Sequence, residues 1–122
     1  NLIIGSHPHV VQEAVLCERD DFLIPVFYSL GNFISNQRKT DENGGVLAKI
    51  EIDRKGKYIS KISYIPFYVY VGSIDKHWQY YLIPTKQYIN NQLDLKIPTL
   101  SENELLIFHQ NTTQKLKNLQ IE

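Results

Sequence analysis

The strongest constraint on this fold is a stretch in which apolar and charged residues alternate. Apolar side chains occupy every second position from 46 to 52, and charged side chains lie at 49, 51 and 53. This period of two is typical of a strand with one buried face. A second run, Tyr58–Ile65, follows the turn Arg54–Lys57, in which Gly56 can adopt a positive φ. We therefore predict an antiparallel hairpin, which Pro66 ends or confines to a sheet edge.

Four shorter apolar runs predict further strands. They are Leu2–Ile4, Val10–Cys17, Ile24–Leu30 and His77–Ile83. We expect the first strand to be buried, and the charged residues 18–21 to form the turn between the second and the third. The polar stretch Asn36–Gly45 contains two adjacent glycines, and this composition predicts a mobile surface loop.

A helix is predicted near the end of the chain, because its start has a recognisable cap. Ser101 and Glu104 have the spacing of a capping box, in which each side chain accepts a bond from a free amide of the first turn. Leu100 and Leu105 have the positions of a hydrophobic staple around that cap. One apolar face then follows at spacings of three and four, and we expect it to pack on the sheet. It comprises Leu105, Phe108, Thr112, Leu116 and Leu119.

Length and composition indicate one domain. A chain of 122 residues, 43% of them apolar, can bury a single core. We predict a mostly β fold of the α+β class over residues 1–122, with mainly antiparallel strands and the C-terminal helix. The formal net charge is zero, which argues against nucleic acid as a partner. Cys17 is the single cysteine, so an internal disulfide is excluded, and we expect a small buried side chain there.

The chain is expected to be a piece of a longer protein. It contains no methionine, and it opens directly on the apolar residues Leu2–Ile4. A native N-terminus usually carries polar, loosely held residues before its first strand. We therefore expect the missing N-terminal part of the same chain to be a partner of this segment, and any signal peptide or membrane anchor to lie upstream.

A possible metal site follows the first predicted strand. His7-Pro8-His9 comes directly after Gly5 and Ser6. Residues two apart in an extended backbone point to the same side, and Pro8 favours an extended conformation at His7. Neutral imidazole is a common ligand of divalent metal ions. Two histidines do not complete a catalytic metal site, however, so two ordinary loop histidines remain an alternative.

Two motifs together resemble a known family. Ile3-Ile4-Gly5-Ser6-His7-Pro8-His9-Val10-Val11-Gln12 precedes Val26-Phe27-Tyr28-Ser29-Leu30-Gly31-Asn32-Phe33. Their order and separation resemble those of the poly-gamma-glutamate capsule-biosynthesis proteins of the CapA type. The resemblance covers roughly the first thirty-five residues by motif, and the rest of the chain by its pattern of strands and final helix.

The resemblance implies a fold and a set of site residues. The family belongs with the calcineurin-like metallophosphoesterases, whose domain is an α-β-β-α sandwich with metal held at strand ends. Residues 1–122 would then be the C-terminal portion of such a domain. His7 and His9 match the superfamily's late His-x-His ligands, and Asn32 is a candidate catalytic or hydrogen-bonding group beside them. No Gly-Asp or Asn-His pair of the earlier ligand blocks occurs in the chain. The full-length protein would therefore hold one or more divalent ions, and this part alone would hold none.

Aromatic side chains concentrate in one third of the chain. They favour a packed core, and a binding platform for sugar or polymer is the alternative. They are Tyr58, Tyr64, Phe67, Tyr68, Tyr70, Trp78, Tyr80 and Tyr81. If the chain is half of a sandwich, one apolar sheet face lacks its cover. We therefore expect self-association, through strand exchange at Leu2–Ile4.

Two functions follow from the resemblance. The first is a metal-dependent, phosphatase-like hydrolase of capsule biosynthesis that acts on an anionic polymer such as poly-gamma-glutamate. The second is a non-catalytic scaffold or binding subunit in polymer export or anchoring, in contact with the capsule machinery. Either function implies the extracytoplasmic face of a bacterial cell envelope, with anchoring through the N-terminal part. A small β-rich module with a chance likeness to the family is the third alternative.

Overall fold

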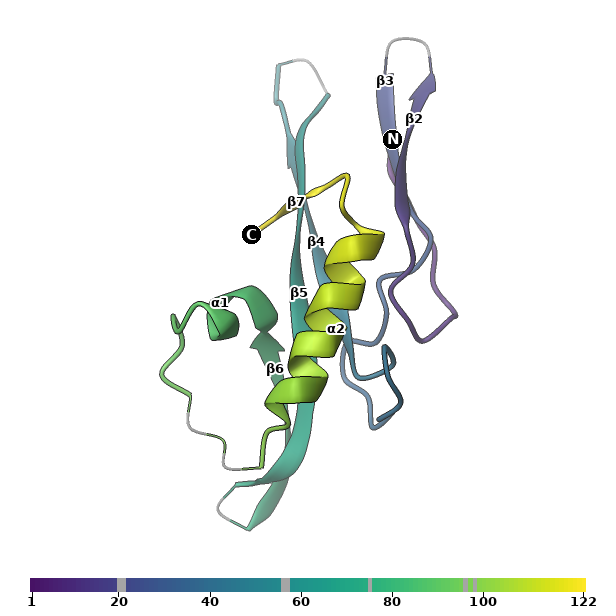
Figure 1. The fold of residues 1–122 in the computed structure, drawn as a ribbon. Helices are drawn as coiled ribbons and strands as arrows, with labels where there is room; N and C mark the ends of the chain where they lie inside the picture. The colour runs from purple at the N-terminus through teal and green to yellow at the C-terminus, as the bar shows by residue number, and fades with distance from the viewer. Residues whose placement is uncertain (20–21, 56–57, 75, 96, 98) are drawn as a thin grey trace.

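The described part of the chain forms two small sheets, a short helix α1 and a longer helix α2 that lies across the second sheet (Figure 1). The computed structural model describes residues 1–19, 22–55, 58–74, 76–95, 97 and 99–122. In the described chain the first sheet has the order β1-β3-β2, and the second has the order β4-β5-β6 with β7 added beside β5. The predicted mostly β fold with a C-terminal helix is confirmed. The bounds are β1 Ile3–Ile4, β2 Ala14–Arg19, β3 Phe22–Phe27, β4 Gly44–Ile52, β5 Ile59–Ile74, β6 His77–Pro84, α1 Thr85–Ile89, α2 Glu102–Lys115 and β7 Gln120–Ile121.

The predicted hairpin is the β4–β5 pair. The two strands are antiparallel from Gly44 opposite Tyr68 to Ile52 opposite Ile59, with an irregularity at the far end. Its turn includes residues 56 and 57, so the conformation expected at Gly56 lies outside the described residues. β6 pairs antiparallel with the other edge of β5, and β7 pairs parallel with it at Ser63 and Tyr64. β5 is therefore the central strand of this sheet.

Pro66 neither ends β5 nor lies at an edge, so that prediction was wrong. It lies buried within β5, opposite Val46 of β4. The amide of Val46 points away from β5 and donates to the carbonyl oxygen of Leu30 at 2.9 Å, so this pair needs no amide from the proline. On its other side, the carbonyl of Pro66 accepts from the Thr85 hydroxyl at 3.2 Å. Along this edge of β5, the pairing with β7 ends at Tyr64 and the pairing with β6 starts at Phe67. A strand that changes partners at one residue can accommodate a proline there.

The two sheets meet along a short pairing of residues 30–32 with residues 44–46, which we call the seam. Leu30 accepts from Val46, and the amide of Asn32 donates to the carbonyl of Gly44 at 3.0 Å. Gly31 bridges Gly45 between these two bonds. Gly44 and Gly45 are thus buried strand residues, whereas the sequence predicted a mobile loop through Gly45.

The core lies between α2 and the second sheet, and Val11, Ala14 and Phe27 of the first-sheet region pack into it. The predicted helix face is confirmed for Leu105, Phe108 and Thr112 of α2 and for its C-cap Leu116, each at most 1% exposed, whereas Leu119 lies beyond the helix and is only partly buried. Only one of the two hydrogen bonds of the predicted capping box forms at the start of this helix. Ser101 Oγ accepts from the Glu104 amide at 3.4 Å, but the Glu104 carboxylate instead accepts from the Tyr68 hydroxyl at 2.8 Å. Burial, with the Glu104 carboxylate second, raises the pKa of Tyr68 to about 12.

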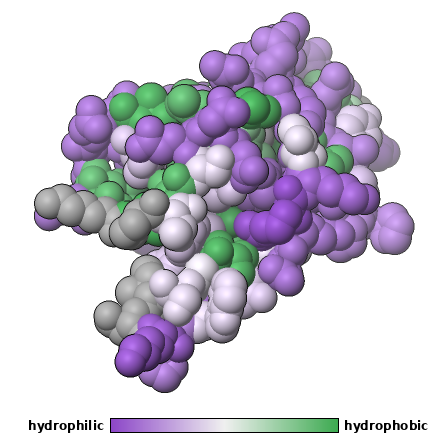
Figure 2. All heavy atoms as spheres, turned by 60° about the horizontal axis from the view of Figure 1, so that its bottom comes forward, coloured by the Kyte–Doolittle hydropathy of each residue, from purple (hydrophilic) through white to green (hydrophobic). Residues whose placement is uncertain are grey.

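The aromatic cluster divides between core and surface. Tyr64, Phe67, Tyr68 and Tyr70 are buried in β5, which agrees with their interpretation as packing residues. Trp78 and Tyr80, on the edge strand β6, are 77% and 46% exposed. Figure 2 shows apolar side chains reaching the surface in separate patches among hydrophilic ones.

Several local predictions for the first sheet were wrong. β1 is not buried, because Ile3 and Ile4 are more than half exposed, and Cys17 is exposed on β2. The strands predicted to end at Cys17 and to begin at Ile24 extend to Arg19 and from Phe22, so part of the expected turn is strand. The remainder of that turn, residues 20 and 21, lies outside the described residues. The short elements α1 and β7 were not predicted. Among the described residues, neither helix has the length and apolarity that a membrane crossing requires.

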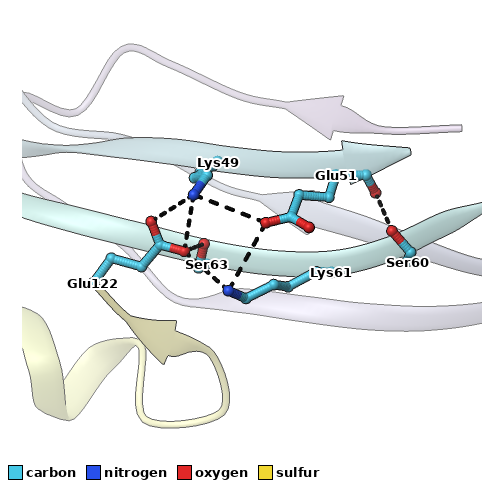
Figure 3. A network of polar contacts seen from close by, with 6 residues as sticks. All are labelled: Lys49, Glu51, Ser60, Lys61, Ser63 and Glu122. Atoms are coloured by element: carbon cyan, nitrogen blue, oxygen red, sulfur yellow. Dashed lines mark hydrogen bonds and ion pairs between the residues drawn. The ribbon is translucent and has the colours of Figure 1, made fainter. Parts of the chain in front are cut away.

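A polar cluster holds β7 against the second sheet (Figure 3). The Glu122 carboxylate accepts from Lys49 Nζ at 2.9 Å, Lys61 Nζ at 3.2 Å and Ser63 Oγ at 2.8 Å. Its amide donates to the Tyr64 carbonyl at 2.9 Å. The bond from Lys49, followed by those from Ser63 and Lys61, lowers the pKa of Glu122 to about 2. This carboxylate therefore favours the folded state in its ionised form.

We expect Leu105→Ala to lower the free energy of unfolding by about 2–5 kcal/mol, because it opens a cavity in a close-packed core. Leu106→Ala is the matched control, since Leu106 is 41% exposed whereas Leu105 is fully buried. The control should change stability by no more than about 0.5 kcal/mol. Urea unfolding at constant pH measures both, and equal effects would contradict the packing of α2 described above.

We expect Glu122→Gln to lower the urea midpoint at pH 7, because the uncharged amide binds the two lysines less well. A carboxylate with a depressed pKa stabilises the fold above its unfolded value of 4.5 and loses that effect as the pH falls towards about 2. The midpoints of the two proteins should therefore converge across that range. Glu51→Gln is the control, because Glu51 lies 3.8 Å from each lysine and should matter less. A gap that stays constant down to pH 2 would refute the assignment.

Candidate functional site

The candidate site begins where β1 passes into the His7-Pro8-His9 turn. The amide of Gly5 donates to the Phe27 carbonyl at 2.7 Å and so extends the pairing of β1 with β3. A Cβ atom at position 5 would lie 2.5 Å from the Tyr28 carbonyl oxygen. Only glycine lets the chain approach this closely, and this contact places the turn beside the end of β3.

Ser29 holds the turn from the opposite side. This side chain is 1% exposed, and its hydroxyl donates to the Pro8 carbonyl at 2.9 Å while accepting from the Gly31 amide at 3.2 Å. The Ser29 carbonyl also accepts from the Gln12 amide at 3.1 Å. Ser29 thus joins the two sequence motifs. Sequence reasoning did not single it out, although it lies in the middle of the second motif.

His9 and Asn32 lie in direct contact, as their motifs suggested. His9 Nδ1 and Asn32 Oδ1 are 2.8 Å apart, although the residues are 23 positions apart in the chain. Asn32 is 8% exposed, whereas the His9 side chain is exposed. A buried amide therefore holds the Nδ1 edge of the imidazole of an exposed residue.

His7 does not have the extended backbone that the sequence suggested. Its φ is 133°, in a region that residues with a Cβ atom rarely adopt, and its side chain is exposed. The argument that Pro8 aligns both imidazoles through an extended chain therefore fails for this turn. Strained backbone is concentrated at functional sites, where the surrounding structure maintains it. Here the surrounding structure is the pair of anchors at Gly5 and Ser29.

The polar stretch after the second motif is anchored to the rest of the fold. Asn32 Nδ2 donates to Gln37 Oε1 and to the Glu42 carbonyl, each at 2.7 Å. Arg38 donates to the Val69 carbonyl at 2.6 Å, and Asp41 pairs with Lys115 of α2 at 3.0 Å. These contacts connect the loop to β5, to α2 and to Asn32. The loop consequently forms a wall around the buried amide of Asn32.

An open groove of about 590 Å³ lies beside the turn. Its lining contains the exposed ring of Tyr28 and two residues of opposite charge, Glu13 and Lys115, of which Lys115 is already paired with Asp41. The other lining residues are Val10, Val11 and Gln12. The groove follows directly from His9 along the chain, so a bound molecule there would lie near the candidate site.

The other histidines lie elsewhere in the fold. His109 contacts the Thr85 hydroxyl at 2.8 Å on the inner side of α2, and burial, with Lys86 second, lowers its pKa. His77 is exposed at the start of β6 and belongs to an Asp-x-His tripeptide whose Asp75 lies outside the described residues. Within the described part of the chain, no group of three or more His, Cys, Asp or Glu side chains is arranged to hold a metal ion.

Comparison with known proteins finds a family model that matches the first part of the chain. Residues 1–37 match the model of the bacterial capsule synthesis protein family PGA_cap. The matched segment includes the turn, Ser29, Asn32 and Gln37, and it ends before β4. No curated protein and no solved structure matches the chain. The match supports a relationship to capsule synthesis, and with it a role at the cell envelope.

Proposed function

We propose that this chain belongs to a metal-dependent, phosphatase-like hydrolase of bacterial capsule synthesis, in which His7 and His9 are metal ligands. The observation that carries the proposal is the His9–Asn32 contact, which joins the two motifs within the matched segment. Metal-binding histidines commonly have their second ring nitrogen held by another side chain. Asn32 holds His9 in this way, so we assign it to positioning and no longer to contact with substrate.

The described residues fit part of a metal site. His9 offers an exposed, oriented imidazole, and His7 lies two residues away on the same turn. A catalytic site needs at least three protein ligands, so the others would come from elsewhere in the full-length protein. When bound, a divalent ion would lower the pKa of a water molecule and polarise a phosphoryl or carbonyl oxygen. This chain would supply two of the ion's ligands and would line the neighbouring groove.

The proposed substrate is an anionic envelope polymer of the poly-gamma-glutamate type, or a phosphoester derived from its synthesis. The family match to capsule synthesis supports this class. The groove beside the turn offers one exposed aromatic ring and an apolar floor, over which an extended polymer could lie. We place the protein on the extracytoplasmic face of the envelope for the same reason.

We expect the full-length protein to bind about one equivalent or more of Zn²⁺ or Mn²⁺, and His9→Ala to weaken binding by at least about 10-fold, because losing a ligand should cost no less than losing a group that positions one. His7→Ala should weaken it as well. His77→Ala is the control, because this exposed histidine lies on β6. Calorimetric titration measures each affinity. Unchanged stoichiometry and affinity in both the His7 and His9 variants would remove the ligand assignment.

A scaffold function is the second candidate, and exposed apolar side chains in the first sheet favour it. Ile3 and Ile4 are 55% and 51% exposed, and Phe22 and Leu23 are each 47% exposed. β1 also forms an edge of its sheet, where unpaired backbone groups can accept another strand. A subunit that assembles capsule machinery would use such a surface for association.

We therefore expect this chain to self-associate through β1, with a molar mass above that of one copy in multi-angle light scattering. Ile4→Lys places a charge on the edge strand and should shift the chain towards the monomer. Ile34→Lys is the control, because Ile34 is 62% exposed but lies outside the strands. A monomeric unmodified chain, or equal dissociation by both substitutions, would contradict this association.

A further inference from the structure

We propose that Asn32 sets the tautomer of His9, so that Nδ1 carries the proton and Nε2 presents a bare lone pair to solvent. Asn32 is then a positioning residue that acts through His9. The ligand implied for Nε2, a divalent cation, rests on the proposed function, but the tautomer itself does not.

The first step is the orientation of the Asn32 amide. One end of this side chain lies 2.7 Å from the Glu42 carbonyl oxygen, which is a backbone group that can only accept. That end must therefore be the NH₂ group. Its second hydrogen is directed to Gln37 Oε1, also at 2.7 Å. The other end, which faces His9, is consequently the oxygen.

The second step is the state of the imidazole. Asn32 Oδ1 can only accept, and it lies 2.8 Å from His9 Nδ1. The hydrogen between them must belong to Nδ1. In a neutral imidazole one nitrogen donates and the other accepts, so Nε2 has no hydrogen. This form can bind a cation through Nε2, whereas the opposite tautomer would direct an N–H at it.

The third step is that the surroundings prevent the amide from turning over. Asn32 is 8% exposed, and its backbone N–H donates to the Gly44 carbonyl across the seam. A Cβ atom at position 45 would lie 2.5 Å from the Asn32 carbonyl oxygen, so Gly45 allows the two strands to approach this closely. A flipped side chain would place its oxygen against the Glu42 carbonyl in a site that water hardly reaches. Two acceptors facing each other there would be unfavourable.

The fourth step is access. The His9 side chain is exposed, although its Nδ1 edge is held by a buried group. Pro8, immediately before it, is bonded to Ser29 through its carbonyl, so the backbone that carries the ring is also held. The ring is therefore oriented at its Nδ1 edge, within a side chain that solvent reaches. An oriented ligand loses less conformational freedom when it binds an ion.

The test is a long-range ¹H–¹⁵N NMR spectrum of the ¹⁵N-labelled protein, with chelator present and at an alkaline pH where free histidine is neutral. We expect a pyrrole-type signal for His9 Nδ1 and a pyridine-type signal for Nε2. Asn32→Ala should lose this single-tautomer pattern. Asn36→Ala, an exposed asparagine of the same loop, should leave it unchanged.

A protonated Nε2 in the unmodified protein would overturn the proposal. An unaltered His9 pattern in Asn32→Ala would also overturn it, provided that the His109 signals show a folded core. If Asn32→Ala fails to fold, the spectrum of the unmodified protein still decides between the two tautomers. No metal is present in this measurement, so its outcome is separate from that of the metal titration. A correct tautomer without ion binding would refute only the proposed function.

Discussion

The seam between residues 30–32 and 44–46 is the interaction on which the rest of the structure depends. It joins the two sheets through the bonds from Val46 to Leu30 and from Asn32 to Gly44. Glycines on both sides make this approach possible, because a Cβ at Gly31 would lie 2.8 Å from the Gly44 carbonyl oxygen. Gly31 also has a φ of 76°, which favours glycine in its own right. This pairing, together with the packing of Val11, Ala14 and Phe27 into the shared core, fixes the histidine turn relative to the second sheet.

The second sheet supplies the stable frame. β5 pairs with β4 and β6, adds β7, and packs against α2. Arg38 of the loop donates to the Val69 carbonyl of β5, and Asp41 of the loop pairs with Lys115 of α2. Both β5 and α2 therefore hold the loop that surrounds Asn32. The core residues of α2 therefore affect the candidate site indirectly. Their packing keeps the wall around the Asn32 amide in place.

The two motifs of the matched segment form one physical unit. Ser29 bonds to Pro8, and Asn32 bonds to His9, so two residues of the second motif each hold one residue of the first. The family match over residues 1–37 covers that unit and stops before the frame that supports it.

Sequence patterns determined the elements with a clear period. The alternation from 46 to 65, the strand at 77–84 and the buried face of α2 all follow from local spacing, because burial of one face requires that spacing. The motifs also indicated His9 and Asn32 as neighbours. Tertiary structure alone decided the rest. Pro66 lies within a central strand because β5 changes partners there, Gly44 and Gly45 are buried because another strand approaches them, and His7 is strained because both sides of its turn are anchored. Each of these depends on contacts between residues far apart in the chain, which local periodicity does not record.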